Sequence, residues 1–279
     1  MTIHFQPACR FLLLACAACA AFPQAISFPN FASTTGLSLK GTAATAPGDD
    51  GAVLRLTKSE TWQAGSAFTA STIPFEIAAD TFSTYFQFRI NNWGGIEPAD
   101  GIVFVIRSPA SPALGERGGG VGYDGISQSI GVKFDTYRNE KEMNDNHVAV
   151  QINGVWADEF TQTPYGVAKC TKPAGVTGCM SNGHLWSVWI DYDGANIHVA
   201  LADGSTKRPP DLVNAPVSLP SILKFATAAY VGFTAATGAG TEVHDILNWR
   251  HSPTYNPTPV GFDQMLQPAP AGNVPSGGR

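Results

Sequence analysis

The fold class is decided by the stretch that begins at Phe82 and reads Phe-Ser-Thr-Tyr-Phe-Gln-Phe-Arg-Ile. Apolar side chains recur at every second position up to Ile90, with Thr84 the one polar member of the series. A period of two predicts a β-strand with one face in a core. The segment from Val148 to Ile152 alternates in the same way, and Ile102 to Ile106 is a continuous apolar run. Such a run predicts a strand buried on both faces.

A β-hairpin is predicted farther along the chain. Alternating apolar residues lead from Trp186 into the turn Asp193-Gly194, and a second alternating series leads out from Ile197. Charged residues make up only 14% of the chain, which contains 29 glycines and 20 prolines. Sparse charge with many turn-forming residues favours an all-β protein with long loops over a helical bundle.

The net charge of -5 gives no electrostatic reason to expect nucleic acid or an anionic membrane as partner. A neutral ligand fits that charge better. The alternating segments run from Ile26 to about His251 without an internal repeat, so we expect a single domain over residues 26–251.

Both ends of the chain differ in composition from this domain. Arg10 precedes an apolar run that is too short to span a bilayer, which predicts a cleaved signal peptide over residues 1–25 and a secreted or periplasmic protein. A lipoprotein attached through Cys16 is the alternative, although the apolar stretch before Cys16 is unusually short. Residues 252–279 are rich in Pro, Gly, Ala and Asn and predict a flexible tail. We expect no membrane insertion.

Two cysteines, Cys170 and Cys179, remain after the predicted signal peptide. An even pair in an exported protein indicates one disulfide bond, which would close a small surface loop. Two free thiols are the alternative. A zinc site is not indicated, because no paired histidines lie nearby.

Oxygen-bearing side chains gather between two predicted strands, at Asp135, Asn139 and Asp145. Calcium takes about six to eight oxygen ligands from carboxylates, amides and backbone carbonyls, and the carbonyl of Tyr137 could add one. An ordinary polar loop, in which Asp and Asn serve as turn residues, is the alternative. The spacing is not that of an EF-hand.

The order of motifs along the chain resembles that of legume-type (L-type) lectins, including bacterial secreted proteins of this kind. It consists of Ala99-Asp100-Gly101, a glycine-rich loop at residues 118–123, Asp135-Thr136-Tyr137-Arg138-Asn139, and flanking segments at residues 26–31, 231–238 and 242–249. The resemblance implies an antiparallel β-sandwich, the jelly roll of concanavalin-like lectins and glucanases. It also implies a non-catalytic protein that binds a glycan or glycoconjugate.

The resemblance also assigns roles to individual residues. Asp100, usually preceded by a cis peptide in the family, would accept hydrogen bonds from sugar hydroxyls, while Gly119 or Gly120 would offer a backbone N–H. Asn139 would donate its amide to the sugar, and the ring of Tyr137 would stack on it. The loop from Thr237 to Gly240, with Gly238 and Ala239, would tune which sugar fits. Calcium held by Asp135, Tyr137, Asn139 and Asp145 would order these loops.

One departure concerns the metals. Plant members carry a glutamate that helps to bind a transition metal at the position of Lys133 here. Lys133 and Asp135 lie on the same side of a strand, so an ammonium there would repel a dication and pair with Asp135 or Asp145. We therefore expect calcium alone, with His147 a structural residue and Asn144 able to share the role of Asp145. Alternatively, Lys133 points outward and the metal site is degraded.

Two other functions stay open at this point. A polysaccharide-active enzyme would need a suitably spaced pair of carboxylates. We find no such pair along a strand, and we expect Glu140 and Glu142 to be solvated in a loop. An adhesion or structural module without sugar binding would explain Lys133. A homodimer is a further expectation, because legume-type sandwiches often pair through a flat sheet.

Overall fold

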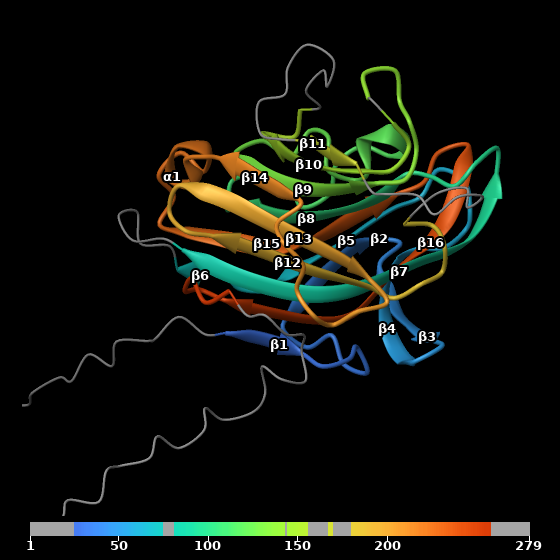
Figure 1. Ribbon diagram of the computed structural model, residues 1–279, viewed down its shortest axis with the longest axis horizontal. Coiled ribbons are helices and arrows are strands. Elements are labelled where there is room, and N and C mark those ends of the chain that lie inside the picture. The colour runs from blue at the N-terminus through green and yellow to red at the C-terminus, as the bar shows by residue number, and fades with distance from the viewer. Residues whose placement is uncertain (1–24, 75–80, 143, 156–166, 170–179, 258–279) are drawn as a thin grey trace, which may run out of the picture.

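The computed structural model describes residues 25–74, 81–142, 144–155, 167–169 and 180–257. Residues 1–24 of the predicted signal peptide, the two cysteines of the predicted disulfide and residues 258–279 of the predicted tail lie outside these residues. Two large antiparallel sheets face one another across the core (Figure 1). The all-β prediction and the sandwich architecture are thereby confirmed.

The first sheet has the strand order β14-β13-β12-β7-β16-β4-β3, with β1 also paired to β16. Its strands are β1 (Ile26–Phe28), β3 (Ala44–Gly48), β4 (Gly51–Thr57), β7 (Phe82–Gly95), β12 (Trp186–Tyr192), β13 (Asn196–Asp203), β14 (Val213–Pro216) and β16 (Gly240–Ser252).

The second sheet has the order β11-β10-β9-β8-β15-β5-β2, with β6 also paired to β15. Its strands are β2 (Leu37–Gly41), β5 (Ala64–Thr69), β6 (Ile73–Pro74), β8 (Gly101–Arg107), β9 (Ser129–Asp135), β10 (His147–Ile152), β11 (Val167–Lys169) and β15 (Ala228–Ala236). Helical structure among the described residues is limited to the short helix α1 (Leu219–Ile222) and the 3-10 turn η1 (Gly118–Gly120).

Aromatic rings from the two sheets meet in the core. The ring of Phe86 on β7 lies 4.9 Å from that of Phe233, 5.8 Å from that of Phe134 and 6.1 Å from that of Phe104, centroid to centroid. This confirms the inward face that the period of two predicts. The other face of β7 is covered as well, because Tyr85 packs against Trp189 of β12 at 5.2 Å. The strand is therefore less exposed than simple alternation suggests.

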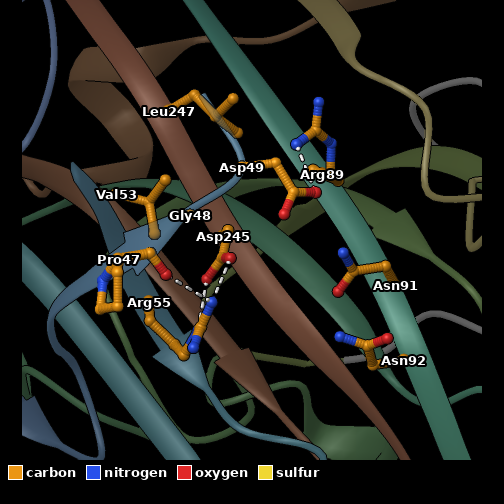
Figure 2. A pocket seen from close by; sticks show the side chains of 10 residues that line it. All are labelled: Pro47, Gly48, Asp49, Val53, Arg55, Arg89, Asn91, Asn92, Asp245 and Leu247. Carbon is orange, nitrogen blue, oxygen red and sulfur yellow. Dashed lines mark hydrogen bonds and ion pairs between the residues drawn. The ribbon is translucent and has the colours of Figure 1, made fainter. Parts of the chain in front are cut away.

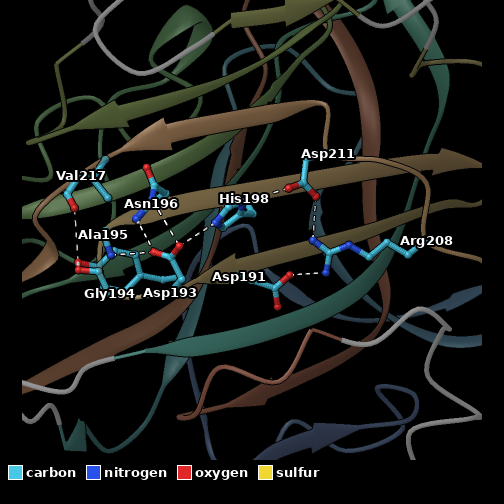
Figure 3. A network of polar contacts seen from close by, with 10 residues as sticks. Asp191, Asp193, Gly194, Ala195, Asn196, His198, Arg208, Asp211 and Val217 are labelled. Carbon is cyan, nitrogen blue, oxygen red and sulfur yellow. Dashed lines mark hydrogen bonds and ion pairs between the residues drawn. The ribbon is translucent and has the colours of Figure 1, made fainter.

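The predicted hairpin is formed by β12 and β13, which pair from Trp186↔Asp203 to Tyr192↔Ile197. Its turn is held by Asp193, whose Oδ1 accepts hydrogen bonds from the N–H groups of Ala195 and Asn196 at 2.8 and 2.7 Å. Polar side chains continue outward from the turn across the hairpin, as Figure 3 shows; they are Asp191, Asp193, His198, Arg208 and Asp211.

Strand register brings several loops to one edge of the second sheet. Gly101, the first residue of β8, pairs with Asp135, the last residue of β9, and also with Ala236, the last residue of β15. The segment before β8, the segment after β9 and the loop between β15 and β16 therefore emerge side by side. The sequence analysis places expected sugar-binding or calcium-binding residues on all three segments.

Candidate functional site

Asp100 sits at the centre of the converging loops. Its backbone N–H donates to the carbonyl of Ala236 at 3.0 Å, and its own carbonyl accepts from the N–H of Thr136 at 3.2 Å. The peptide bond between Ala99 and Asp100 is cis, as the resemblance implies. The residue is only 4% exposed, and its Oδ2 accepts no hydrogen bond within the described part of the chain.

The glycine-rich loop lies directly against this aspartate. The N–H of Gly118 donates to the carbonyl of Thr237 at 3.1 Å. A Cβ atom built on Gly238 would lie 3.3 Å from the Cα of Gly118 and 3.4 Å from Oδ2 of Asp100. The loop between β15 and β16 is therefore fixed between the glycine-rich loop and Asp100.

Asn139 completes the group from the loop after β9. A Cβ atom on Gly119 would lie only 2.6 Å from Oδ1 of Asn139, so a glycine is required for this approach. A Cβ on Gly120 would instead meet the Cβ of Glu116 at 2.8 Å, away from Asn139. Gly119, rather than Gly120, faces the amide. Tyr137 is half-buried and Ala239 is exposed at the rim.

Lys133 is fully buried and does not point outward. Its Nζ lies 2.6 Å from Oε1 of Glu142 and 3.2 Å from Oδ2 of Asp135. Oδ1 of Asp135 accepts a hydrogen bond from the N–H of Tyr137 at 2.9 Å. The ammonium thus pairs with Asp135, as expected, and also with a glutamate that the sequence analysis did not assign to the site.

Glu142 is 3% exposed, so the interpretation of this residue as solvated is wrong. Its N–H donates to the carbonyl of Asn139 at 3.1 Å, and the resulting turn carries the carboxylate back over the loop. There Oε2 accepts hydrogen bonds from the backbone N–H and from Nδ2 of Asn139, at 2.6 and 3.0 Å. The spacing Asn-x-x-Glu, which matches that of a capping box, is the signal that could have identified it.

The acidic group around Lys133 differs from the expected one. Ligand atoms of Asp135, Glu142 and His147 lie within 4.8 Å of one another, whereas Asp145 is half-exposed and outside this group. Glu142 thus joins Asp135 in this group, a residue that the sequence analysis did not assign to it. The ring of His147 bonds through Nδ1 to the carbonyl of Asn144 at 3.1 Å.

Negative charge is in excess at this site. The buried carboxylates of Asp135 and Glu142 both contact the single ammonium of Lys133, and the carboxyl group of Asp100 is buried nearby. Burial, together with the neighbouring Asp135 and Glu242, raises the pKa of Asp100 to about 8. Burial also raises the pKa of Asp135, despite the opposing effect of Lys133.

Carboxylate and amide oxygens around an uncompensated negative charge suit one calcium ion. Asp135, Asn139 and Glu142 supply oxygens of the type that calcium takes, although Oδ2 of Asp135 and Oε1 of Glu142 are already paired with Lys133. A second, transition metal does not fit, because the ammonium of Lys133 already lies between the carboxylates that would hold it.

A buried network supports the site from the first sheet. Glu242 accepts hydrogen bonds from the hydroxyl groups of Thr136 and Ser181, and its Oε1 lies 3.0 Å from Nε2 of His244. The contact to Thr136 fixes the residue next to Asp135. None of these roles was predicted, because they depend on how β16 passes beneath the loop.

A hollow of about 260 Å³ opens on the outer face of the first sheet, away from these loops (Figure 2). Arg55 and Asp245 point toward each other there and form two hydrogen bonds, at 2.7 and 2.8 Å, and Arg89 pairs with Asp49 at 3.2 Å. The arginines are thus neutralised by aspartates of the same chain. The candidate site therefore lies at the loop edge and not in this hollow.

Residues 24–265 match the legume lectin domain family. The chain belongs to that family. Among its relatives is a lectin-like protein of Arabidopsis thaliana, 28% identical, with the alignment covering 77% of this chain and 87% of the relative. A seed lectin of Styphnolobium japonicum is 32% identical over 62% of this chain and 57% of its own length.

Solved structures of legume lectins superpose on the sandwich. Basic winged bean lectin with Tn-antigen gives a TM-score of 0.66 at 28% identity, over 82% of this chain and 98% of the lectin. Winged bean acidic lectin complexed with methyl-α-D-galactose gives a TM-score of 0.67 at 25% identity, over 85% of this chain and 100% of the lectin. The family and these neighbours are lectins, which agrees with the expectation of a non-catalytic protein.

Some relatives are much longer than this legume lectin chain. It matches a probable L-type lectin-domain containing receptor kinase of Arabidopsis thaliana at 28% identity, over 78% of this chain but 33% of the kinase. The chain thus spans about a third of the length of such relatives. In the part of the lectin that the structure describes, no helix is long and apolar enough to cross a membrane.

Trp62 is a further residue of the lectin's loop edge, one that the sequence analysis did not single out. The backbone N–H of Trp62 donates to the carbonyl of Gly238 at 3.1 Å. A Cβ atom built on Gly118 would lie 3.6 Å from Cζ3 of the indole. The indole is 59% exposed. No local sequence pattern marks it, because its partners lie on two distant loops.

Proposed function

We propose that this protein is a non-catalytic lectin that binds a neutral glycan at the loops around Asp100, Gly119 and Asn139, and that its binding depends on calcium. The convergence of these three residues carries the proposal. Asp100 approaches Gly238 while Gly119 closes on Asn139, although the loops lie far apart in the sequence. Sugar sites combine a few directed polar groups with apolar contact, and this arrangement supplies both.

Each group has a definite role in the proposed complex. A sugar hydroxyl would donate to Oδ2 of Asp100, a buried acceptor that has no hydrogen-bond partner among the described residues. Nδ2 of Asn139 uses one hydrogen for Glu142 and has a second for the sugar. Tyr137, half-buried beside them, offers its ring as an apolar contact. Ala239 lies at the exposed rim, where a side chain would contact the ligand's outer groups.

Calcium bound by Asp135, Asn139 and Glu142, with the carbonyl of Tyr137, would supply the positive charge that the buried carboxylates lack. The excess of carboxylates over the single ammonium of Lys133 supports this ion, as do the oxygens of Asn139 and Glu142 at its edge. Among the solved relatives, winged bean acidic lectin was crystallised with methyl-α-D-galactose. For this chain the sugar class is proposed only as a neutral glycan.

The test is a glycan array probed with protein from residue 26 onward, once with calcium and once with chelator. We expect binding with calcium and a loss of at least tenfold with chelator. Asp100→Asn should abolish binding in both conditions. Asp245→Asn, which changes an equally buried aspartate on the outer face of the first sheet, should leave binding unchanged.

Each contrary result has a definite meaning. Binding that survives chelation would overturn the calcium dependence and keep the lectin. Absence of binding in all conditions, with a folded protein by circular dichroism, would favour an adhesion or structural module. Release of reducing sugar from a polysaccharide would favour an enzyme.

We also propose that the chain is exported and that Cys170 and Cys179 form a disulfide. The apolar N-terminal segment and the even cysteine pair support this. N-terminal sequencing of the secreted or periplasmic product should begin near residue 26. Treatment of this product with a thiol-alkylating reagent should raise its mass only after reduction, because a disulfide leaves no free thiol on Cys170 or Cys179.

A further inference from the structure

Glu242 is a carboxylate in the interior of the sandwich. It is the third residue of β16, and its side chain is fully buried. Burying a carboxylate costs free energy unless donors surround it, and an apolar side chain of similar size is often as stable in such a place. Core packing alone therefore does not account for a glutamate here, directly beneath the loop that follows β9.

Three donor groups hold the Glu242 carboxylate in one orientation. Oε1 accepts a hydrogen bond from the hydroxyl group of Thr136 and lies 3.0 Å from Nε2 of His244. Oε2 accepts from the hydroxyl group of Ser181 at 2.6 Å. Nδ1 of His244 lies 2.6 Å from Oγ1 of Thr57 on β4, so the imidazole is itself fixed from both ring nitrogens. All of these side chains are buried, and the carboxylate is out of reach of a ligand in solvent.

Thr136 connects this carboxylate to the proposed glycan site. Its hydroxyl group is bound to Glu242, and its backbone N–H donates to the carbonyl of Asp100 at 3.2 Å. The N–H of Asp100 donates in turn to the carbonyl of Ala236 at 3.0 Å. The backbone of Asp100 is thus held on one side by the end of β15 and on the other by Thr136, whose own place depends on the contact to Glu242.

Glu242 also acts on Asp100 through its charge. Burial is the main cause that raises the pKa of Asp100 to about 8, and the carboxylates of Asp135 and Glu242 raise it further. A change at Glu242 therefore reaches Asp100 by two routes, the hydrogen bonds of Thr136 and the local potential. A change at Thr136 that removes only its hydroxyl group acts by the first route alone.

We propose that Glu242 is a positioning residue of the glycan site, which holds the backbone of Asp100 through Thr136 and so sets glycan affinity without touching the glycan. The inference rests on the proposed function and deepens it, since it extends the site from the loop edge into the first sheet. A hydrogen bond from a sugar hydroxyl to Oδ2 of Asp100 weakens steeply when the acceptor is displaced, so the support of the backbone matters.

The experiment is isothermal titration calorimetry at saturating calcium with the methyl glycosides of galactose, mannose, glucose and N-acetylgalactosamine. For a glycoside that the wild type binds, Glu242→Gln and Thr136→Val should each lower the affinity about tenfold. The double variant should lose little more than either single variant, because both substitutions remove the same contact. Thr136→Ser keeps the hydroxyl group and should keep the affinity.

Ser181→Ala is the matched control. It removes the other hydroxyl group from the same carboxylate, but Ser181 makes no contact that leads to Asp100 in the described part of the chain. Its affinity should stay within about twofold of that of the wild type, because the contact between Glu242 and Thr136 remains.

Amide hydrogen exchange supplies a second measurement, which needs no ligand. The N–H groups of Asp100 and Thr136 should exchange faster in Glu242→Gln and in Thr136→Val than in the wild type, and at the wild-type rate in Ser181→Ala. Amides in the middle of β7 and β12 should keep their wild-type protection in all variants. Faster exchange throughout both sheets would mean a general loss of stability and would overturn the positioning role.

The two proposals fail in different ways. Unchanged affinity in Glu242→Gln, additive losses in the double variant, or an equal loss in Ser181→Ala would each overturn the positioning role and leave the lectin intact. Absence of wild-type binding to all four glycosides and to the glycan array would overturn the lectin, and the positioning role with it.

Discussion

The ammonium of Lys133 lies 2.6 Å from Oε1 of Glu142, and both side chains are buried. A buried ion pair is sensitive to the loss of one partner, because the other is then left as an uncompensated charge in a medium of low dielectric. At this position the pair also neutralises part of the carboxylate charge around Asp135. A fixed positive charge from the chain thus stands where the resemblance implies a second metal.

Lys133→Met should leave two buried carboxylates without their shared cation. We expect the free energy of unfolding in chelator to fall by about 3–5 kcal/mol. Because a dication could then enter between Asp135 and Glu142, added Mn²⁺ should recover stability in the variant and not in the wild type. Denaturant titration with and without Mn²⁺ measures both effects, and the exposed Lys58→Met serves as the control. Equal stability of variant and wild type in chelator would show that the ammonium is dispensable.

Gly119→Ala should weaken glycan binding by at least tenfold, because its methyl group would lie 2.6 Å from Oδ1 of Asn139 and displace that amide. Gly120→Ala introduces a comparable clash, at 2.8 Å from the Cβ of Glu116, but on the side away from Asn139. Overpacking costs each variant about 1–3 kcal/mol of stability. Affinity measured by calorimetry should therefore separate two variants that denature alike. If Gly120→Ala weakened binding as much as Gly119→Ala, the assignment of Gly119 to the ligand would be incorrect.

His251 makes the fold sensitive to acid. Burial lowers its pKa to about 3, and its ring lies 5.4 Å from that of Phe82. The unfolded chain binds a proton near the ordinary pKa of about 6.5, so it holds more protons than the folded protein between these values. Stability should therefore fall as pH decreases from about 6.5 toward 3, by up to about 1.4 kcal/mol per pH unit from this group. Denaturant titrations at pH 7, 6 and 5 should give a flatter profile for His251→Leu; parallel profiles would contradict the assignment.

Arg208 neutralises the buried Asp191 on the hairpin and also pairs with Asp211 at 3.0 Å (Figure 3). Arg208→Met should cost about 2–3 kcal/mol of stability, because the Asp191 carboxylate loses its counter-charge. Adding Asp191→Asn to that variant should recover most of the loss. Asp211→Asn alone should cost much less, since that side chain is partly exposed. Thermal unfolding of the wild type, these three variants and Asp191→Asn alone tests the coupling, and strict additivity of Arg208→Met and Asp191→Asn would exclude it.

Much of the fold could be predicted from local patterns. The alternation from Phe82 to Ile90 and the turn at Asp193 and Gly194 depend on neighbouring residues alone, and β7, β12 and β13 confirm them. The order of motifs predicted the family. In the structure Gly119 lies against Asn139, and Asp100 lies against Gly238.

The parts that were missed depend on contacts between distant segments or on the path of a loop. Glu142 is charged and lies in a polar loop, so its burial follows only from the turn at Asn139 and the pairing with Lys133. Trp62 is fixed by Thr237 and Gly238, and no pattern near residue 62 indicates either contact. Glu242 was likewise missed because it meets Thr136 only after β16 crosses beneath the loop.

The hydrogen bond from Asp100 to Ala236 has a consequence for the order in which the protein folds. Such long-range contacts are slow to form, since the intervening chain must lose its freedom before they stabilise anything. We expect the ligand site to assemble late, after the two sheets have paired, and no fragment that ends before β15 to contain it. Recovery of ligand binding during refolding would then report the last step of folding, later than the far-ultraviolet signal of the strands.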